Sequence, residues 1–359
     1  MYATCTGMPL LSIFFFSHHD PGTGPDRYDF VLSTTRLAED LGFHAVWLPE
    51  RHFHPFGGLF PNPAVVAAAL ATRTQRIGLR AGSVVLPLHH VARVAEEWAV
   101  VDALSNGRVG VSAATGWNQG DFVLGTTPFE ERREHTYRAV EALQALWRGE
   151  ELRLPSRGAE VPVRTYPRPV QASLPLWLTA TSGPGTFREA ARRGLGVLTG
   201  YLQQDHQQLS DHIGQYRTGF VPGGSAGAPH VTLMVHACVA ETTPAALAQA
   251  HPPLLAYQGQ FLSLSDRAND PRADEEPLTE DEKQELARYA THKYLTERGL
   301  VGDAGVAACR LRELAAMGVD EVACLVDFGL PPDLVTQTLV RLAAVSGLSA
   351  PAAVPAGSA

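Results

Sequence analysis

Short apolar segments alternate with stretches of helical periodicity along most of the chain. These segments predict eight buried strands, at residues 10–16, 45–48, 76–83, 108–115, 175–180, 195–199, 230–240 and 321–327. Between them apolar residues recur at helical spacing, as at Val91, Val94 and Trp98. Eight strands that are each followed by a helix, without a GxGxxG fingerprint, predict a (β/α)8 TIM barrel rather than a doubly wound sheet.

Two stretches depart from this alternation. Residues 149–175 are rich in Pro and Arg with little periodicity, which indicates a long excursion on the barrel surface. Residues 254–299 follow the seventh strand and are acidic at their centre. Within them Thr279 and Glu282 form a capping box that opens a helix. We expect this segment to be an inserted helical lid in a single domain of residues 1–348, followed by a disordered Ala/Pro-rich tail at 349–359.

Composition narrows the class of protein. The 359 residues are 45% hydrophobic and 18% charged, which is typical of a globular enzyme. The net charge of −8 argues against a nucleic-acid partner, since such proteins need a clustered basic face. No apolar run is long enough to span a membrane and no signal-peptide pattern is visible, so we expect a cytoplasmic protein. The four cysteines lack CxxC spacing, so no metal site is expected.

Polar residues directly after the predicted strands are the candidates for chemistry, because TIM-barrel sites lie at the carboxyl ends of the strands. Glu50, Arg51 and His52 follow the second strand, and His52 can act as a general acid or base near neutral pH. The structural alternative is a Glu50–Arg51 ion pair with His52 capping the loop. His18 and His236 are further pocket candidates, with core packing equally expected for His236.

Residues 179–186, with the sequence TATSGPGT, join the fifth strand to its helix. Hydroxyl groups and free backbone N–H groups at a helix N-terminus form a ready phosphate site. A single phosphate site favours a mononucleotide over a dinucleotide. The small residues Gly82 and Ser83 at the end of the third strand, and Thr115 with Trp117 after the fourth, complete the candidate site, although simple packing explains Trp117 equally well.

Several of these pieces carry a family resemblance. The stretches ERHFHPFGGLFPNP, RAGSVVLPLHH, RVAEEWAVVDALSNGRVG, VTLMVH and GVDEVACLVDFG resemble the bacterial luciferase-like monooxygenases, over about residues 9–345. More narrowly, they look like the branch that accompanies polyketide and nonribosomal peptide assembly lines, of the mupirocin-pathway type. These proteins are TIM barrels that use FMN and O2 to oxygenate an organic substrate.

The resemblance implies a set of partners and roles. Reduced FMN would come from a separate flavin reductase, and the substrate would be a small molecule, free or tethered to a carrier protein. A homodimer is implied, with a face on the helices near residues 64–70 and 91–98. His52 is the implied catalytic residue, and Arg51, His18 and His236 are implied in the substrate pocket. The implied flavin-binding residues are Gly82, Ser83, Thr115, Trp117, Thr181, Ser182, Gly183 and Thr186, and the Gly82–Ser83 peptide matches a position that is often cis in the family.

The chain departs from luciferase itself at three places. Luciferase has two adjacent histidines after the glutamate, whereas here the first is Arg51 and only His52 matches. Ala114 and Thr115 stand where luciferase has Cys and Arg, and Thr181 stands where it has Glu. Two rival functions therefore stay open. One is hydride transfer with the deazaflavin F420, and the other is flavin binding without catalysis.

Overall fold

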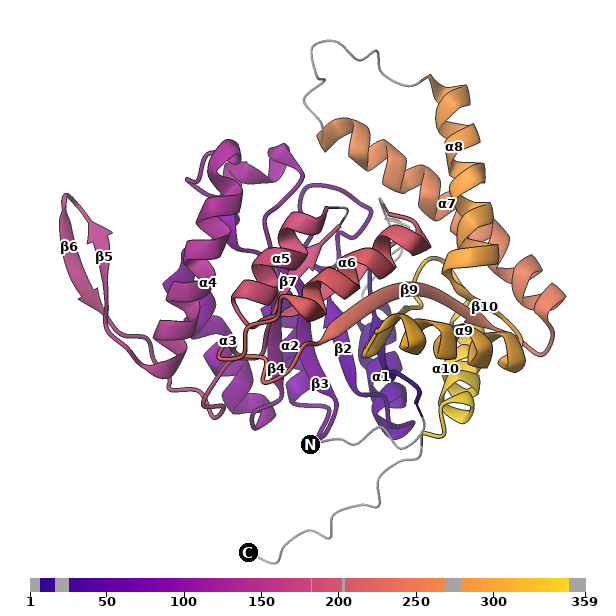
Figure 1. Ribbon diagram of the computed structural model, residues 1–359, viewed down its shortest axis with the longest axis horizontal. Coiled ribbons are helices and arrows are strands. Elements are labelled where there is room, and N and C mark those ends of the chain that lie inside the picture. The colour runs from indigo at the N-terminus through magenta and orange to yellow at the C-terminus, as the bar shows by residue number, and fades with distance from the viewer. Residues whose placement is uncertain (1–6, 17–25, 182, 202–203, 269–278, 349–359) are drawn as a thin grey trace, which may run out of the picture.

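The computed structural model describes residues 7–16, 26–181, 183–201, 204–268 and 279–348 (Figure 1). The predicted tail at 349–359 and the candidate residues His18 and Ser182 lie outside these ranges. Within them, no helix is long and apolar enough to cross a membrane.

Eight parallel strands form a closed barrel, which confirms the predicted fold. They run in the order β11-β1-β2-β3-β4-β7-β8-β9, and β9 pairs with β11 to close the ring. The strands are β1 (Leu10–Phe14), β2 (Ala45–Leu48), β3 (Gly78–Val85), β4 (Val109–Ala114), β7 (Leu176–Ala180), β8 (Gly196–Gly200), β9 (Val231–Val239) and β11 (Glu321–Leu325). A short strand that the sequence pattern does not predict, β10 (Leu300–Gly302), pairs with the far end of β9.

Helices cover the outside of the barrel (Figure 1). They are α1 (Asp26–Asp40), α2 (Pro63–Ala71), α3 (Val91–Ser105), α4 (Arg132–Arg148), α5 (Pro184–Arg192), α6 (His206–Thr218), α7 (Thr243–Ala268), α8 (Glu280–Lys293), α9 (Ala304–Met317) and α10 (Pro332–Val345). Short helical turns are η1 (Leu86–Leu88), η2 (Gln119–Leu124), η3 (Phe129–Glu131) and η4 (Tyr294–Arg298). The strands are buried on both faces, which explains why they read as continuous apolar runs.

A buried ion pair occupies the amino-terminal part of the barrel interior. Arg80 Nη1 donates to Glu321 Oε2 over 2.5 Å, and the guanidinium lies 5.0 and 4.7 Å from the ring centroids of Trp47 and Trp177. Ser12 and Trp47 donate to the other oxygen of Glu321. Burial alone would raise the pKa of Glu321, but the charge of Arg80 and the bond from His230 outweigh it and hold the pKa well below its usual range. This network fills one end of the barrel and leaves the carboxyl ends of the strands for a ligand.

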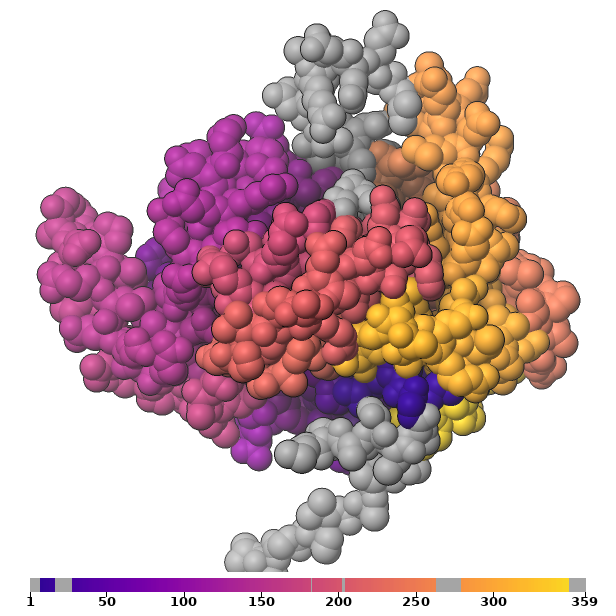
Figure 2. Space-filling model, viewed as in Figure 1, coloured from indigo at the N-terminus to yellow at the C-terminus, as the bar shows by residue number. Residues whose placement is uncertain are grey.

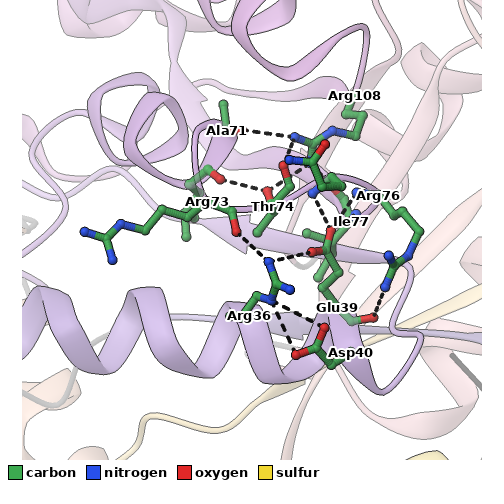
Figure 3. A network of polar contacts seen from close by, with 11 residues as sticks. Arg36, Glu39, Asp40, Ala71, Arg73, Thr74, Arg76, Ile77 and Arg108 are labelled. Atoms are coloured by element: carbon green, nitrogen blue, oxygen red, sulfur yellow. Dashed lines mark hydrogen bonds and ion pairs between the residues drawn. The ribbon is translucent and has the colours of Figure 1, made fainter. Parts of the chain in front are cut away.

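A second polar network fastens the loop between α2 and β3 (Figure 3). Glu39 Oε1 accepts hydrogen bonds from three successive backbone N–H groups, those of Gln75, Arg76 and Ile77, at 2.6–3.1 Å. Arg108 donates to the carbonyl oxygens of Ile77 and Thr74 at 2.6 and 2.9 Å. These bonds satisfy loop groups that would otherwise be buried without partners, so the network stabilises the fold away from the candidate site.

The surface excursion predicted at 149–175 contains an antiparallel hairpin of β5 (Leu152–Ser156) and β6 (Ala159–Val163). Figures 1 and 2 show it projecting from the body, beyond α4. Its turn places Arg157 and Gly158 at φ 47° and 82°. The sequence did not reveal these strands because both are short and largely exposed, with only Leu152, Leu154 and Val163 partly buried against the core.

The segment expected as an insertion at 254–299 starts within a longer helix. Helix α7 begins at Thr243 and runs through Pro252 and Pro253 into that segment. The predicted capping box is confirmed, because Glu282 N donates to Thr279 Oγ1 and Thr279 N donates to Glu282 Oε2. Helices α7 and α8 lie side by side on the side of the molecule opposite the hairpin (Figure 1).

Candidate active site

A single carboxylate organises the loop after β2. Glu50 Oε1 accepts hydrogen bonds from His52 Nε2 at 2.8 Å and from His89 Nε2 at 2.7 Å. Its other oxygen accepts from the backbone N–H of Val85 at 2.8 Å, at the end of β3. Glu50 is buried, so these bonds form in a low-dielectric setting where they are strong. The carboxylate thereby joins the ends of two strands through a polar centre.

The charge state of this centre follows from its hydrogen bonds. Burial alone would raise the pKa of Glu50, but the bonds from His52 and His89 and the charge of His89 outweigh it and lower the pKa. Burial would lower the pKa of His89, but the bond to Glu50 outweighs it and the pKa is raised. A charged Glu50 fixes His52 with Nε2–H as donor, which leaves Nδ1 as the nitrogen that can accept a proton. The expected alternative, a Glu50–Arg51 ion pair, is wrong, because Glu50 is bonded to the imidazoles instead.

Arg51 stacks on aromatic rings. Its Cζ lies 4.2 Å from the ring centroid of Phe16 and 5.4 Å from that of Trp117. Gly57 has a φ of +83°, and a Cβ there would lie 2.6 Å from Arg51 Cγ, so glycine leaves room for this side chain. Burial lowers the pKa of Arg51 to about 10, against the opposing effects of Tyr257 and Asp121, so the guanidinium stays charged at neutral pH.

Hydroxyl groups from three strands meet beside the Gly82–Ser83 peptide bond, which is cis. Ser83 Oγ is hydrogen-bonded to Thr179 Oγ1, which also bonds Ser112 Oγ at 2.7 Å. A Cβ at Gly82 would lie 2.8 Å from a ring carbon of Phe14, so no other residue fits there without a shift. The implied cis bond is confirmed, and the hydroxyl cluster gives this part of the barrel mouth its polar lining.

The loop after β4 continues toward α7. Thr115 is partly exposed, and Gly116 has a φ of +77°. A Cβ on Gly116 would lie 2.9 Å from Val85 Cγ1, so the chain passes close to the end of β3. Trp117 is 41% exposed, and its ring centroid lies 6.2 Å from that of Phe261 on α7. Trp117 therefore connects the barrel mouth to α7 rather than filling the core.

The N-terminus of α5 has free space among the described residues. Its N-cap residue Gly183 makes no side-chain capping bond, and a Cβ at Gly183 or Gly185 would meet no described atom within 4 Å. Thr181 is exposed, while Thr186 is partly exposed and hydrogen-bonded to Tyr137. Free space in front of a helix start is what an anion needs to approach the first-turn N–H groups.

His236 lies among aromatic rings rather than in an open pocket. It is 2% exposed, and in the described part of the chain neither ring nitrogen has a hydrogen-bond partner. Its ring centroid lies 4.9, 4.7 and 5.2 Å from those of Tyr257, Tyr294 and Phe328. Burial lowers the pKa of His236 to about 3, so the imidazole is neutral under physiological conditions.

Part of this site is not evident from the sequence. The pattern places Glu50 among the candidates after a strand and gives His89 only as a pocket or capping residue before a helix, without joining the two. Ser112 and Thr179 lie inside strands, where a hydroxyl is not distinguishable from a core residue. A cavity of about 580 Å³ lies elsewhere, beside Leu174 at the amino-terminal end of β7.

Comparisons with known proteins agree with this geometry. The sequence profile of the luciferase-like monooxygenase family matches residues 10–321. The oxygenase component of a flavin-dependent trigonelline monooxygenase from Acinetobacter baylyi is 25% identical over 329 residues, which is 90% of each chain.

Solved structures agree on the fold. The oxygenating constituent of 3,6-diketocamphane monooxygenase from Pseudomonas putida, in complex with FMN, has a TM-score of 0.74 at 16% identity, covering 95% of this chain and 98% of that chain. An F420-dependent secondary alcohol dehydrogenase has a TM-score of 0.69 at 18% identity, covering 93% and 99%. At such identities these two structures establish the fold alone.

The chain belongs to the luciferase-like monooxygenase family. It is accordingly an oxidoreductase of that family, with its candidate site at the carboxyl ends of the barrel strands.

Proposed function

We propose that the protein is the oxygenase component of a two-component, FMN-dependent monooxygenase. A separate reductase supplies reduced FMN, and the protein uses it with O2 to oxygenate a small organic substrate, free or carried on a carrier protein, in natural-product biosynthesis. The observation that carries the proposal is the Glu50 centre, with its fixed His52, at the same barrel mouth as an open helix N-terminus.

The residues at the mouth fit FMN. The start of α5 has room for a phosphate next to Gly183, Gly185 and Thr186, and Thr181 is exposed beside it. Ser182 belongs to this proposed phosphate site by sequence. One such helix start supports a mononucleotide over a dinucleotide.

The ring end of the cofactor would lie over small and hydroxyl-bearing residues. Gly82 and Ser83 are small enough for a flat ring to approach the backbone, and the hydroxyls of Ser83 and Thr115 can hydrogen-bond it. Trp117 would cover one side of the flavin ring, and its contact with Phe261 would connect it to α7. Helices α7 and α8 would thus act as the lid that excludes water.

His52 is the proposed catalytic residue. When bound, reduced FMN supplies two electrons to O2, so that one oxygen atom enters the substrate and the other leaves as water. Glu50 holds His52 with Nε2–H toward the carboxylate, and Nδ1 can then take or return a proton at the reacting atoms. His89 shares the same acceptor and orients Glu50 in turn. We also propose a homodimer, with α2 and α3 in its interface.

F420-dependent hydride transfer is one alternative function, because an F420-dependent secondary alcohol dehydrogenase has the same fold. A non-catalytic flavin-binding protein is the other rival, and the buried charged centre at Glu50 argues against it, since such a centre is expensive to keep without a use. Binding of FMN and of F420 to the purified protein, followed by reductase-coupled turnover, separates these functions. A protein that binds F420 but does not bind FMN would contradict the proposal.

A further inference from the structure

We propose that Arg51 binds a carboxylate group of the substrate, so that the substrates of this enzyme are small organic acids with a planar or aromatic body. This inference rests on the proposed function, because it concerns the substrate of the same site.

The first observation is a cation that makes no direct ion pair with a described residue, although Asp121 acts on it at longer range. In the described part of the chain, no carboxylate lies within ion-pairing distance of the Arg51 guanidinium and no hydrogen bond satisfies it; its neighbours are the faces of Phe16 and Trp117. Its backbone N–H donates to the carbonyl oxygen of Phe60, which fixes the position of the residue in its loop. The guanidinium is partly buried, and a charge-assisted hydrogen bond to an anion is stronger there than in bulk water.

The second observation is that the carboxylates near Arg51 are bonded to other groups. Glu50 is bonded to two imidazoles and a backbone N–H. Asp327 accepts from the backbone N–H of Phe16 at 2.8 and 2.9 Å. Asp121 accepts from Asn118 Nδ2 at 2.8 Å, and its burial raises its pKa even though His52 and Arg51 oppose this. Among the described residues no carboxylate is therefore left to pair with Arg51, and the proposal assigns this role to the substrate.

The third observation is an accessible aromatic surface beside Arg51. Trp117 is 41% exposed and Phe16 is partly exposed, and the guanidinium lies 5.4 and 4.2 Å from their ring centroids, whereas Phe56, Tyr257 and His236 are buried. Aromatic side chains bind flat, apolar groups through stacked or edge-to-face contacts. An acid with a planar body would place its charge on Arg51 and its body along this surface.

Stereochemistry favours a carboxylate over a phosphate. The N–H groups of a guanidinium lie in its plane, and that of Arg51 lies over the Phe16 ring at 4.2 Å from the centroid. A carboxylate is planar and accepts two parallel N–H bonds in that plane, and the bidentate pair is among the strongest hydrogen-bonded arrangements in proteins. Asp121 interacts with both Arg51 and His52, so the bound acid would lie beside the proposed catalytic imidazole.

Binding of benzoate and of its neutral analogue benzamide tests the inference. We expect FMN-loaded wild-type protein to bind benzoate at least about tenfold more tightly than benzamide, since a charge-assisted pair to Arg51 is lost in the amide. Arg51→Met should remove the preference, Arg51→Lys should keep part of it, and the control Arg138→Gln, at an exposed position on α4, should keep all of it. FMN affinity is measured separately for each protein.

Chemical modification of arginine tests the contact between Arg51 and the ligand in the wild-type protein, without a substitution. Phenylglyoxal reacts with arginine, and peptide mapping reports the extent at each position. Benzoate should protect Arg51 and benzamide should not, with Arg138 equally modified in both. Equal protection by the two compounds, or by neither, in a protein that binds FMN would overturn the carboxylate assignment and leave the proposed function intact. A wild-type protein that does not bind FMN would instead overturn the proposed function.

Discussion

His52 and His89 share one acceptor, the Oε1 atom of Glu50, at 2.8 and 2.7 Å. The two histidines are far apart in sequence, one after β2 and the other after β3, and the carboxylate holds both strand ends together. In such an arrangement the orientation of the catalytic imidazole depends on a residue that need not touch the substrate. Glu50 is thus a positioning residue for His52.

Replacing Glu50 tests that role. In Glu50→Gln the amide cannot accept from both imidazoles as a charged group does, so we expect the free energy of unfolding at neutral pH to fall by about 1–3 kcal/mol. The pKa of Glu50 is lowered in the folded protein, so its contribution is present above the ordinary value of 4.5 and is lost as the pH falls below it. Urea unfolding should therefore show a gap between wild type and variant at neutral pH that narrows as the pH falls below 4.5. Glu134→Gln, at an exposed site, should show no gap.

The proposed phosphate site can be tested with two substitutions of similar size, of which only one adds a negative charge. A Cβ at Gly185 meets nothing within 4 Å, so Gly185→Asp and Gly185→Asn both fit. An aspartate in the first turn suits the helix dipole but repels a phosphate, so FMN affinity should fall at least about tenfold in Gly185→Asp and remain close to wild type in Gly185→Asn. The measurement is FMN fluorescence titration. Equal affinities in the two variants would remove the start of α5 from the site.

The barrel itself was predictable from sequence because each strand is buried on both faces and each covering helix has an apolar stripe. What the pattern could not reveal has physical causes. The hairpin at 152–163 is short and largely exposed, and α7 continues through Pro252 and Pro253, residues that usually end a helix. In the site, His52 was found from its place after a strand. Its partnership with Glu50 and His89 depends on the distance between two strand ends, which a linear pattern does not contain.

His236 gives a prediction about stability against acid. The pKa of its imidazole falls from 6.5 to about 3 on burial. As the pH drops below 6.5 the unfolded chain takes up a proton that the folded protein does not, so this group reduces stability by about 1.4 kcal/mol per pH unit. His236→Phe removes this pH-dependent loss of stability, together with two ring nitrogens that have no partner in the described part of the chain. Its stability should therefore decline less steeply between pH 6.5 and 4 than that of the wild type or of the exposed control His251→Gln. Parallel curves would contradict the closed aromatic setting.

The proposed dimer rests on exposed apolar residues of α2 and α3. Val65 and Val100 are 66% and 43% exposed and line one surface groove with Tyr166, whereas Leu70 and Trp98 of the same helices are buried. A charge at the centre of an apolar interface costs several kcal/mol, so Val65→Glu should yield monomers by light scattering at micromolar concentration. Val340→Glu on α10, with similar exposure to Val100, should leave the oligomeric state unchanged. A wild-type monomer would refute the interface.

The fate of isotopically labelled O2 tests the central claim most directly. The protein is supplied with a flavin reductase, FMN and a set of small aromatic acids, and mass spectrometry follows the label. The account predicts one labelled oxygen atom in the product of the wild type. It also predicts, for His52→Ala with unchanged FMN affinity, about a 10²- to 10⁴-fold lower product rate, with hydrogen peroxide released instead. Product formation by His52→Ala at the wild-type rate, or substrate turnover by the wild type with reduced F420 and without incorporation of label, would contradict it.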